Sequence, residues 1–431
     1  MAADTATEKA TEKATGTATV TATDTAAGAT VGVTLAQRVD RIKPSASTAA
    51  AQRVRELKAQ GHRILDLTVG EPDFDTPDHV KAAAIEAIGR GETKYTPVNG
   101  TPALRAAIAD KLARRQGLRY PADRITVGGG AKQVIFLALA ATLNPGDEVV
   151  VPAPYWVSYP DMVLANDGTP VVVPCPETGG FKLTARQLAA AITDATRWVV
   201  LNAPNNPTGA AYTTAELRAL ADVLLAHPHV LVLTDEIYDE IWYGPGLPPT
   251  IVGVEPRLAD RVFVTNGVSK TYAMTGWRIG YGAGPAELVG AVNTLQSQIS
   301  SCPSSISQAA ATAALTGDQG FIRDCVAVYR ARRDATVKTL TDIPGLTCVA
   351  PSGGFYVLVG CAGLLGKRTP AGETIRDDQA FARYLLESQR VAVIHGAAYG
   401  APGYFRVSFA TSSAVLAESC ERIARACADL S

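Results

Sequence analysis

The chain has 431 residues, of which 47% are hydrophobic and 19% are charged, so it can bury a sizeable core and is long enough for more than one domain. Its formal net charge of -1 gives no electrostatic reason to expect a nucleic-acid or anionic-membrane partner. A small molecule is therefore the expected partner.

Residues 1–33 are mostly Ala, Thr and Gly, with an ATEKATEKAT near-repeat and no aromatic side chain. Such a segment cannot bury enough apolar surface to offset the entropy of ordering, so we expect a disordered tail. It has no continuous apolar run, and the first arginine of the chain is Arg38, so neither a secretory signal nor an Arg-rich transit peptide is indicated. No later stretch supplies the roughly 18 apolar residues of a membrane span.

The cysteines and histidines are dispersed along the chain. The seven cysteines include no CxxC pair, which argues against a disulfide framework and is typical of a reducing, cytoplasmic location. The one close histidine pair, His227 and His229, has no carboxylate or thiol nearby in the sequence. We therefore expect no metal site.

The elements predicted from the pattern fall into three segments. Residues 34–75 contain a helical stretch that closes on Gly61, and we expect this segment to pack with the C-terminal domain. In 76–318, β-branched runs alternate with helical patterns, which indicates a mostly parallel sheet covered by helices on both faces. In 319–431, a long helix and further strands indicate a smaller α+β domain. The predicted strands of the larger domain include residues 147–152, 171–174, 197–202, 230–236, 262–266 and 278–282.

Lys270 follows one of these strands in a turn rich in Gly, Ser and Thr. A lysine at such a place is usually a solvated surface residue. Here Ser269 and Thr271 flank it, and Arg278 follows eight residues later at the head of another apolar strand. Burial beside a cation lowers the pKa of a lysine, which frees its amine for covalent and proton-transfer chemistry.

A Gly-rich turn between a strand and a helix, ITVGGGAKQ, gathers free backbone N–H groups at the positive end of a helix dipole. This arrangement suits a phosphate group, although such turns are also common without a ligand. The turn lacks the GxGxxG and GxxxxGK[ST] patterns, which lowers the dinucleotide and P-loop alternatives.

Nine ordered motifs give the chain a family resemblance from about residue 34 to 430. It resembles the class I and II aminotransferases, specifically the subgroup with bacterial aspartate and prephenate aminotransferases. The motifs are KPSAS (43–47), LTVGEPDFDTP (67–77), KYTPVNGTPALR (94–105), VGGGAKQ (127–133), PAPYWVSYP (152–160), NAPNNPTG (202–209), TDEIYDE (234–240), SKTYAMTGWRIGY (269–281) and FRVSFAT (405–411).

The resemblance implies a fold-type I enzyme of the α/β class, with a mostly parallel seven-stranded sheet between helices and a smaller α+β domain. It implies pyridoxal 5'-phosphate as cofactor, with Lys270 as Schiff-base lysine and proton shuttle. Asp235 would pair with the pyridinium nitrogen, where a helix N-cap is the plainer alternative. Tyr238 and Asn206 would bind the phenolic oxygen.

The same resemblance implies how the rest of the cofactor is held. Trp156 would stack on the ring, the alternative being a core aromatic residue. Tyr95 would reach the phosphate of the neighbouring subunit's cofactor, which makes a homodimer with shared active sites part of the prediction. The implied phosphate ligands of the same chain are Gly130, Ala131 and Lys132, mostly through backbone N–H groups, with Ser269 and Arg278.

Arg406 matches the family arginine that binds the substrate α-carboxylate, for which its planar fork is well suited. The alternative is a buried structural ion pair. Gly70 would let the backbone approach the same carboxylate, and Trp156 and Asn206 would also contact the substrate.

Several positions depart from the family pattern. Ser297 stands where aspartate-specific enzymes carry an arginine for the distal carboxylate, so a dicarboxylic substrate is not indicated. Cys302, Gly354 and Tyr399 replace a usual Asn, Ala and Phe, and His395 replaces a common Pro. His395 is either structural or an acid, base or polar contact near the cofactor.

The predicted function is transamination between an α-amino acid and a keto acid. A specialised enzyme that performs β- or γ-replacement, elimination or ring formation shares the first deprotonation, so it stays open as an alternative. A non-catalytic regulator is disfavoured, because residues 1–33 are too short and polar for a DNA-binding module.

Overall fold

The computed structural model describes residues 33–44 and 46–431. The predicted disordered tail therefore lies, apart from Val33, outside the described residues. Residues 33–36 are exposed and form no helix or strand, and residues 37–431 make up one compact unit. The division of that unit at residues 75 and 318 stays a prediction.

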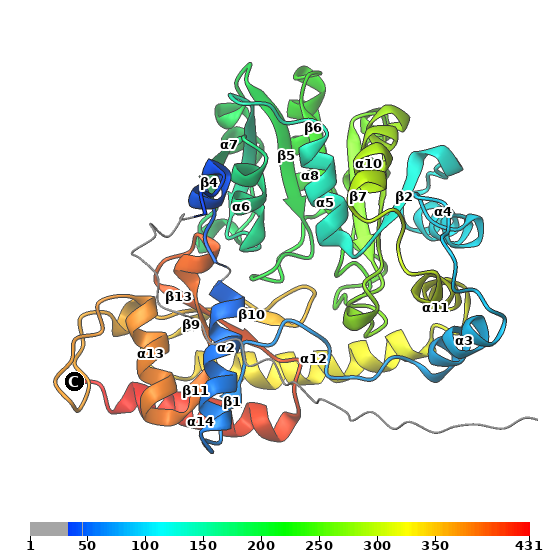
Figure 1. Ribbon diagram of the computed structural model, residues 1–431. Helices are drawn as coiled ribbons and strands as arrows, with labels where there is room; N and C mark the ends of the chain where they lie inside the picture. Colours follow the sequence, from blue (N-terminus) through cyan, green and yellow to red (C-terminus); the bar gives the residue numbers. More distant parts are fainter. Residues whose placement is uncertain (1–32, 45) are drawn as a thin grey trace, which may run out of the picture. The chain divides into compact units, whose positions relative to one another are not determined.

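A seven-stranded sheet forms the centre of the compact unit, in the order β2-β8-β7-β6-β5-β3-β4 (Figure 1). All neighbouring pairs from β7 through β4 are parallel, and β8 alone runs antiparallel to both of its neighbours. This confirms the predicted mostly parallel α/β sheet. The strands are β2 (Ile125–Gly128), β3 (Glu148–Ala153), β4 (Thr169–Pro174), β5 (Thr196–Asn202), β6 (Leu231–Asp235), β7 (Val262–Gly267) and β8 (Gly280–Ala283).

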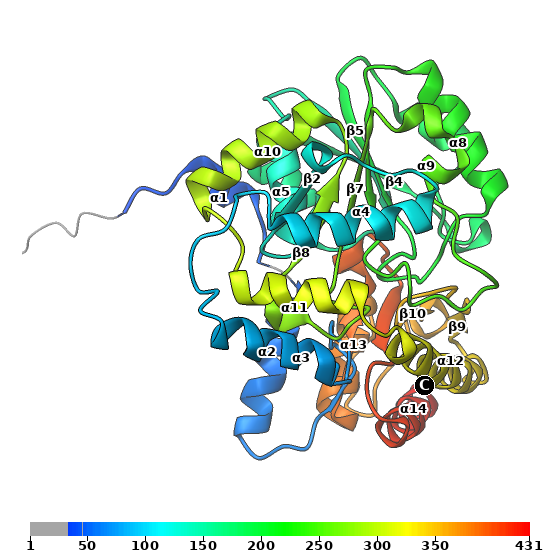
Figure 2. The ribbon, with the colours of Figure 1, turned by 90° about the vertical axis from the view of Figure 1, so that its right-hand side faces the viewer.

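Both faces of this sheet are buried, as the apolar strands predict. In β5, Trp198 and Val200 pack into one cluster, and Val199 and Leu201 pack into another on the opposite face. Figure 2 shows α4 and α11 on the second of these faces. The first face is covered by α5 (Ala131–Ala140), α6 (Ser158–Ala165) and α10 (Ala286–Ile299), and the second by α4 (Pro102–Gln116), α7 (Ala185–Ala191), α8 (Thr214–Ala226) and α11 (Ser305–Thr316).

A second, four-stranded antiparallel sheet has the order β12-β13-β10-β9 and lies with α12, α13 and α14 in Figure 1. Its aromatic core includes Phe355, Phe381, Phe405 and Phe409, all fully buried. A short parallel pair joins β1 (Leu65–Asp66) to β11 (Val391–Ala392). The remaining α-helices and β-strands of the described residues are α1 (Gln37–Arg41), α2 (Ala46–Ala59), α3 (Asp78–Gly89), α9 (Ile251–Val254), α12 (Gly320–Thr341), β9 (Thr347–Cys348), β10 (Tyr356–Gly360), α13 (Asp378–Gln389), β12 (Ile394–His395), β13 (Tyr404–Ser408) and α14 (Ser413–Ala428).

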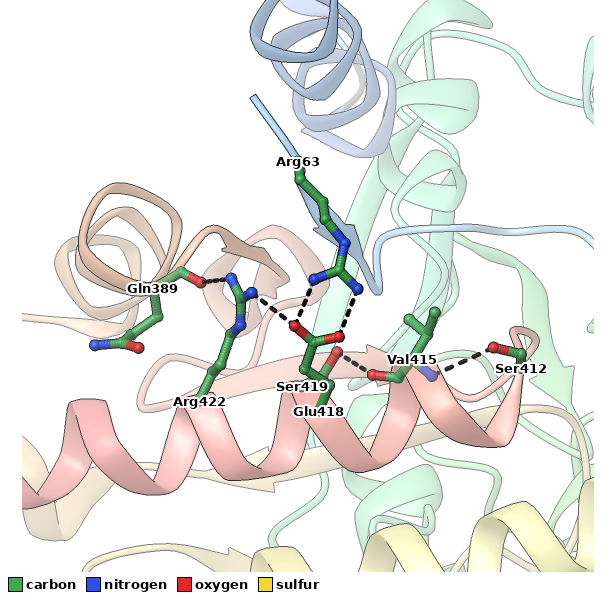
Figure 3. A network of polar contacts seen from close by, with 7 residues as sticks. All are labelled: Arg63, Gln389, Ser412, Val415, Glu418, Ser419 and Arg422. Atoms are coloured by element: carbon green, nitrogen blue, oxygen red, sulfur yellow. Dashed lines mark hydrogen bonds and ion pairs between the residues drawn. The ribbon is translucent and has the colours of Figure 1, made fainter. Parts of the chain in front are cut away.

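A polar network attaches the segment before β1 to the last helix (Figure 3). Both terminal nitrogens of Arg63 donate to the carboxylate of Glu418, at 2.7 and 2.6 Å. Arg422 donates to Glu418 at 2.7 Å and to the carbonyl of Gln389 at 2.8 Å. These bonds join residue 63 to α14, and α14 to the end of α13.

Within the described ranges, no helix has the length and apolar character needed to cross a bilayer. The seven cysteines all fall in these ranges, and none forms a disulfide. No three His, Cys, Asp or Glu side chains of the described chain gather into a group that could hold a metal ion.

Candidate active site

A cavity of about 670 Å³ opens where β5, β6 and β7 end, at the carboxyl edge of the parallel strands. This is the edge at which ligands of such sheets bind. Its walls also include β10, β13, α2 and the segment after β1. The predicted site residues that line it are Gly70, Ala131, Lys132, Trp156, Asn206, Asp235, Tyr238, Ser269, Lys270, Arg278 and Arg406.

Lys270 presents its amine to this cavity from the turn after β7. Its Nζ donates to the carbonyl oxygen of Gly70 at 2.5 Å. Burial of the amine lowers the pKa of Lys270 to about 8, and Arg406 and Arg278 lower it further, whereas Glu71 and Asp235 act in the opposite direction. A larger fraction of this amine is therefore neutral near pH 7 than for an ordinary lysine.

Asp235 ends β6 and is buried. Its Oδ2 accepts a hydrogen bond from the hydroxyl of Tyr159 at 2.6 Å, and its Oδ1 accepts one from the backbone N–H of Ile237 at 3.2 Å. Burial raises the pKa of Asp235 to about 6, although these two bonds and Lys270 lower it. Asn202 donates to the backbone carbonyl of Asp235 at 2.9 Å and so joins the ends of β5 and β6.

Arg406, on β13, is buried to 2% exposure and faces the cavity. Its two terminal nitrogens donate to Asn206 Oδ1 at 3.1 Å and to the carbonyl of Thr68 at 2.7 Å. The guanidinium lies 4.2 Å from the centre of the Tyr356 ring and 5.3 Å from that of Tyr399. No carboxylate of the described residues forms an ion pair with it, so the structural ion pair weighed from the sequence is not formed.

Tyr238 and Asn206 reach the same cavity from different elements. The hydroxyl of Tyr238 donates to that of Tyr356 at 3.2 Å, and burial raises the pKa of Tyr238 well above its usual value. The backbone N–H of Asn206 donates to Asn202 Oδ1 at 3.0 Å. Asn202 therefore holds both the Asn206 loop and the end of β6.

The opposite end of the cavity is formed by the N-terminus of α5. Gly130 has φ +98°, and a Cβ built there would fall 2.2 Å from Nη2 of Arg278, so this position requires glycine. Arg278, itself at φ +56°, donates to the carbonyls of Thr275 at 3.0 Å and Gly129 at 3.1 Å. Backbone N–H groups, the helix dipole and a guanidinium thus converge on one end.

The side chain of Lys132 extends along the cavity wall. Its Nζ lies 4.7 Å from the centre of the Trp156 ring, and Trp156 meets Tyr159 edge-on at 5.3 Å between ring centres. Burial and the nearby Arg278 lower the pKa of Lys132. The sequence indicated Lys132 chiefly for its backbone N–H, and its ammonium is an additional cation in the cavity.

Two predicted site residues are absent from the lining of this cavity, Gly130, which caps the N-terminus of α5 beside Ala131, and Tyr95. The side chain of Tyr95 is 89% exposed. Ser297 and Cys302 also lie outside the cavity, and Cys302 Sγ accepts from the backbone N–H of Thr96 at 3.4 Å. Within one chain, Tyr95, Ser297 and Cys302 contribute nothing to the site.

The other three departures from the family pattern are His395, Gly354 and Tyr399, and none of them lines the cavity. His395 does not line the cavity, and its Nδ1 lies 3.7 Å from Asp378, so an acid or base role at the cofactor has no support. Gly354 has φ +70°, and a Cβ added to it would meet Tyr238 only at 3.6 Å, so backbone conformation rather than space disfavours alanine here. Tyr399 is fully buried under Arg406.

Sequence reasoning missed Tyr159, Asn202, Thr68 and Tyr356. Asn202 stood at the end of a predicted strand, which is a usable signal, and Tyr159 lay inside the quoted PAPYWVSYP motif. Thr68 acts through its backbone carbonyl, for which the side chain gives no signal.

Comparison with known proteins identifies a family for the whole compact unit. The model of the aminotransferase class I and II family matches residues 62–423. The chain is 52% identical over 396 residues to an aspartate aminotransferase of Rhizobium meliloti (strain 1021), covering 92% of this chain and 97% of the relative. It is 51% identical over 397 residues to an aspartate/prephenate aminotransferase of Cereibacter sphaeroides, covering 92% and 99%.

Solved structures agree with this result. The crystal structure of the Rhizobium meliloti aspartate aminotransferase superposes with a TM-score of 0.90 at 51% identity, covering 93% of this chain and all of that one. The Thermus thermophilus aspartate aminotransferase with maleate gives 0.85 at 41% identity, with coverage of 92% and 100%. These neighbours confirm the predicted fold, and the aminotransferase names favour transamination over replacement or elimination. The chain belongs to the class I and II aminotransferases, a family that generally uses pyridoxal phosphate, and it is a transferase.

Proposed function

We propose that this aminotransferase binds pyridoxal phosphate in the 670 Å³ cavity and attaches it through Lys270. The observation that carries the proposal is that one cavity contains an amine with a pKa of about 8, a buried carboxylate, and an anion cradle at the end of α5. These groups suit the aldehyde, the pyridine nitrogen and the phosphate of that cofactor, respectively.

The residues present fit the cofactor at both ends. At the phosphate end, the missing side chain of Gly130 leaves the helix N-terminus open, and Arg278 and Ser269 line the same part of the wall. At the ring end, Asp235 is oriented by Tyr159 and by the Ile237 N–H, so a carboxylate oxygen can meet a protonated ring nitrogen. Tyr238 and Asn206 are within the same cavity for the phenolic oxygen.

When bound, pyridoxal phosphate supplies an aldehyde that captures amines and a ring that accepts the electrons of the Cα–H bond. Lys270 then moves the proton. When not attached to the cofactor, the neutral Lys270 amine would take the Cα proton and return it to the cofactor's C4′ carbon, two atoms away. Its hydrogen bond to Gly70 holds Nζ at the cavity wall in the meantime.

The substrate α-carboxylate is assigned to Arg406. Arginine has five N–H donors, so both terminal nitrogens keep an N–H for the substrate after binding Asn206 and Thr68. The names of the relatives support aspartate as an amino donor, against our expectation from Ser297. The Lys132 ammonium in the cavity supports this substrate, because it offers a cation for a second carboxylate.

We also propose a homodimer with shared active sites. Tyr95 is a large aromatic residue that is 89% exposed in one chain, and Ile85 and Ile88 on neighbouring α3 are 69% and 54% exposed. Exposed apolar residues so close in sequence are typical of a protein interface. Tyr95 would then complete the phosphate site of the partner subunit.

A single-turnover experiment tests the proposed function. Holoenzyme mixed with L-aspartate and no keto acid should release one equivalent of oxaloacetate per active site and then stop, because the amino group stays on the enzyme. Later addition of 2-oxoglutarate should restart turnover with formation of glutamate. Release of ammonia, or of a product that lacks the β-carboxylate, would contradict transamination. Mass spectrometry of the products decides between these outcomes.

Replacement of Tyr159 by Phe tests the orientation of Asp235. The change removes the donor to Oδ2 and raises the pKa of Asp235 above its value of about 6. As the pH is lowered, a carboxylate with a raised pKa becomes protonated at a higher pH. The loss of cofactor binding on the acid side should therefore begin at a higher pH in the variant. Loss of a hydrogen bond to a charged group predicts a roughly ten- to hundredfold weaker cofactor affinity at pH 7.

Fluorescence titration of the apoprotein with pyridoxal phosphate between pH 5 and 8 measures this change. Tyr155→Phe is the matched control, because neither tyrosine lines the cavity and, among the described residues, only Tyr159 donates a side-chain hydrogen bond to Asp235. Identical pH profiles for the two variants would rule out the assigned role of Tyr159.

A further inference from the structure

We infer that Arg55 binds a second anionic group of the substrate, far from the α-carboxylate, and thereby favours long dicarboxylic substrates. The inference rests on the proposed function, because it concerns the outer end of the same cavity. On α2, Thr48, Ala51, Arg55 and Lys58 are spaced by three or four residues and share one helix face. All four line the cavity.

The cavity carries more positive than negative side chains. Four of the cations have the roles proposed above, namely Lys132, Lys270, Arg278 and Arg406. Lys58 is ion-paired with Asp66 at 3.6 Å. The charged lining of the cavity includes the cations Arg55, Lys58, Lys132, Lys270, Arg278 and Arg406, and the carboxylates Asp66, Glu71 and Asp235.

Arg55 is a cation without a carboxylate partner. Its Nη2 donates to Gln52 Oε1 at 2.6 Å, and within the described part of the chain no Asp or Glu forms an ion pair with it. A guanidinium that faces a cavity with an excess of positive charge attracts an anion to that point. Its planar fork matches a carboxylate in a bidentate geometry.

The position of Arg55 is fixed by the buried residues on either side of it along the helix, of which Val54 also lines the cavity. Val54 and Leu57 are buried and pack against Ile64 and Ala392. The arginine is thus carried by an anchored helix rather than by a loop.

A chain of polar contacts connects this helix face to Arg406. Lys58 pairs with Asp66, whose Oδ1 accepts from the Thr68 hydroxyl at 2.6 Å, and the Thr68 carbonyl accepts from Arg406. An extended segment from Asp66 to Thr68 therefore stands between the two cationic regions. In this inference, a long dicarboxylic acid held by Arg406 is the substrate whose second carboxylate reaches Arg55.

The test compares two arginines of the same helix. Arg53 is 56% exposed, is ion-paired with Glu56 at 3.4 Å and does not line the cavity. Arg53→Ala and Arg55→Ala therefore remove the same charge from one helix, and only the second removes it from the cavity. The probes are adipate and hexanoate, which have six carbons each and differ by one carboxylate. Binding to holoenzyme is followed by the change in cofactor absorbance.

Arg55→Ala should weaken adipate binding about three- to tenfold and leave hexanoate unchanged. Arg53→Ala should change neither, and Arg55→Glu should weaken adipate more than Arg55→Ala does. Equal weakening of both acids, or no change in either, overturns the inference. The aspartate single turnover is measured on the same preparations. If it stays intact while adipate binding is unaffected, the assignment of Arg55 fails and the proposed function stands.

Discussion

Lys270→Ala should reduce single turnover of aspartate by about a hundred- to ten-thousandfold, the range expected for loss of a positioned proton-transfer group. Lys270 supplies both the attachment of the cofactor and the base at Cα in our proposal. Its amine lies in the cavity with a pKa of about 8, so the neutral form is available near pH 7. The measurement is rapid-mixing kinetics of oxaloacetate release.

Lys132 is a second lysine in the same cavity, and its pKa is also lowered. A further experiment must therefore show which of the two lysines carries the cofactor. Borohydride reduction of wild-type holoenzyme, followed by peptide mass mapping, should find the cofactor on the peptide that contains Lys270. Lys132→Ala should keep that label. A label on Lys132, or wild-type turnover in Lys270→Ala, would contradict the assignment.

Lys111→Met should lower the free energy of unfolding by about 3–5 kcal/mol, the usual cost of removing one partner from a buried ionic group. Lys111 lies on α4 with 2% of its side chain exposed, and its Nζ is 3.4 Å from Asp239 and 3.3 Å from Glu240. Burial lowers its pKa, but these carboxylates outweigh burial and hold the pKa of Lys111 well above its usual value. Removal of this charge leaves Asp239 buried with Arg115, at 3.1 Å, as its remaining cationic partner among the described residues.

Lys81→Met is the matched control. Lys81 is 44% exposed and pairs with Asp78 at 2.7 Å on the surface of α3, so its loss should lower the free energy of unfolding far less than the loss of Lys111 does. Urea denaturation at fixed protein and cofactor concentration measures both variants. Adding Asp239→Asn to Lys111→Met should cost less than the sum of the two single changes. Equal stabilities for Lys111→Met and Lys81→Met would show that Lys111 does not stabilise the fold through Asp239 and Glu240.

The sheet and much of the cavity could be predicted because their signals are local. Asp235 and Lys270 follow apolar strands, and parallel strands bring their carboxyl ends to one edge. Gly130 sits in a strand-to-helix turn whose glycine run is visible in the sequence. The role of each of these residues still came from the family motifs rather than from spacing.

The contacts that adjust the site could not be predicted, because they join residues remote in sequence. Tyr159 and Asp235 are 76 positions apart, and Arg406 and Thr68 are 338 apart. Lys111 is a charged residue in a helix, and because such residues are mostly exposed, nothing in the sequence indicates its burial. Arg55 resembles any solvent-facing arginine until the cavity beside α2 is seen.

Two backbone carbonyl groups of one short segment accept hydrogen bonds from the two basic side chains, Lys270 and Arg406, that are assigned to the substrate. Gly70 accepts from Lys270 and Thr68 accepts from Arg406, although the two cations come from different sheets. The backbone from 68 to 70 therefore sets the separation between the amine and the guanidinium. In our proposal, an α-amino acid, whose amino group is on the carbon next to the carboxylate, spans these two side chains. A β-amino acid has one more carbon between its amino group and its carboxylate. When Arg406 holds that carboxylate, the reacting C–H bond would not lie beside the Lys270 amine.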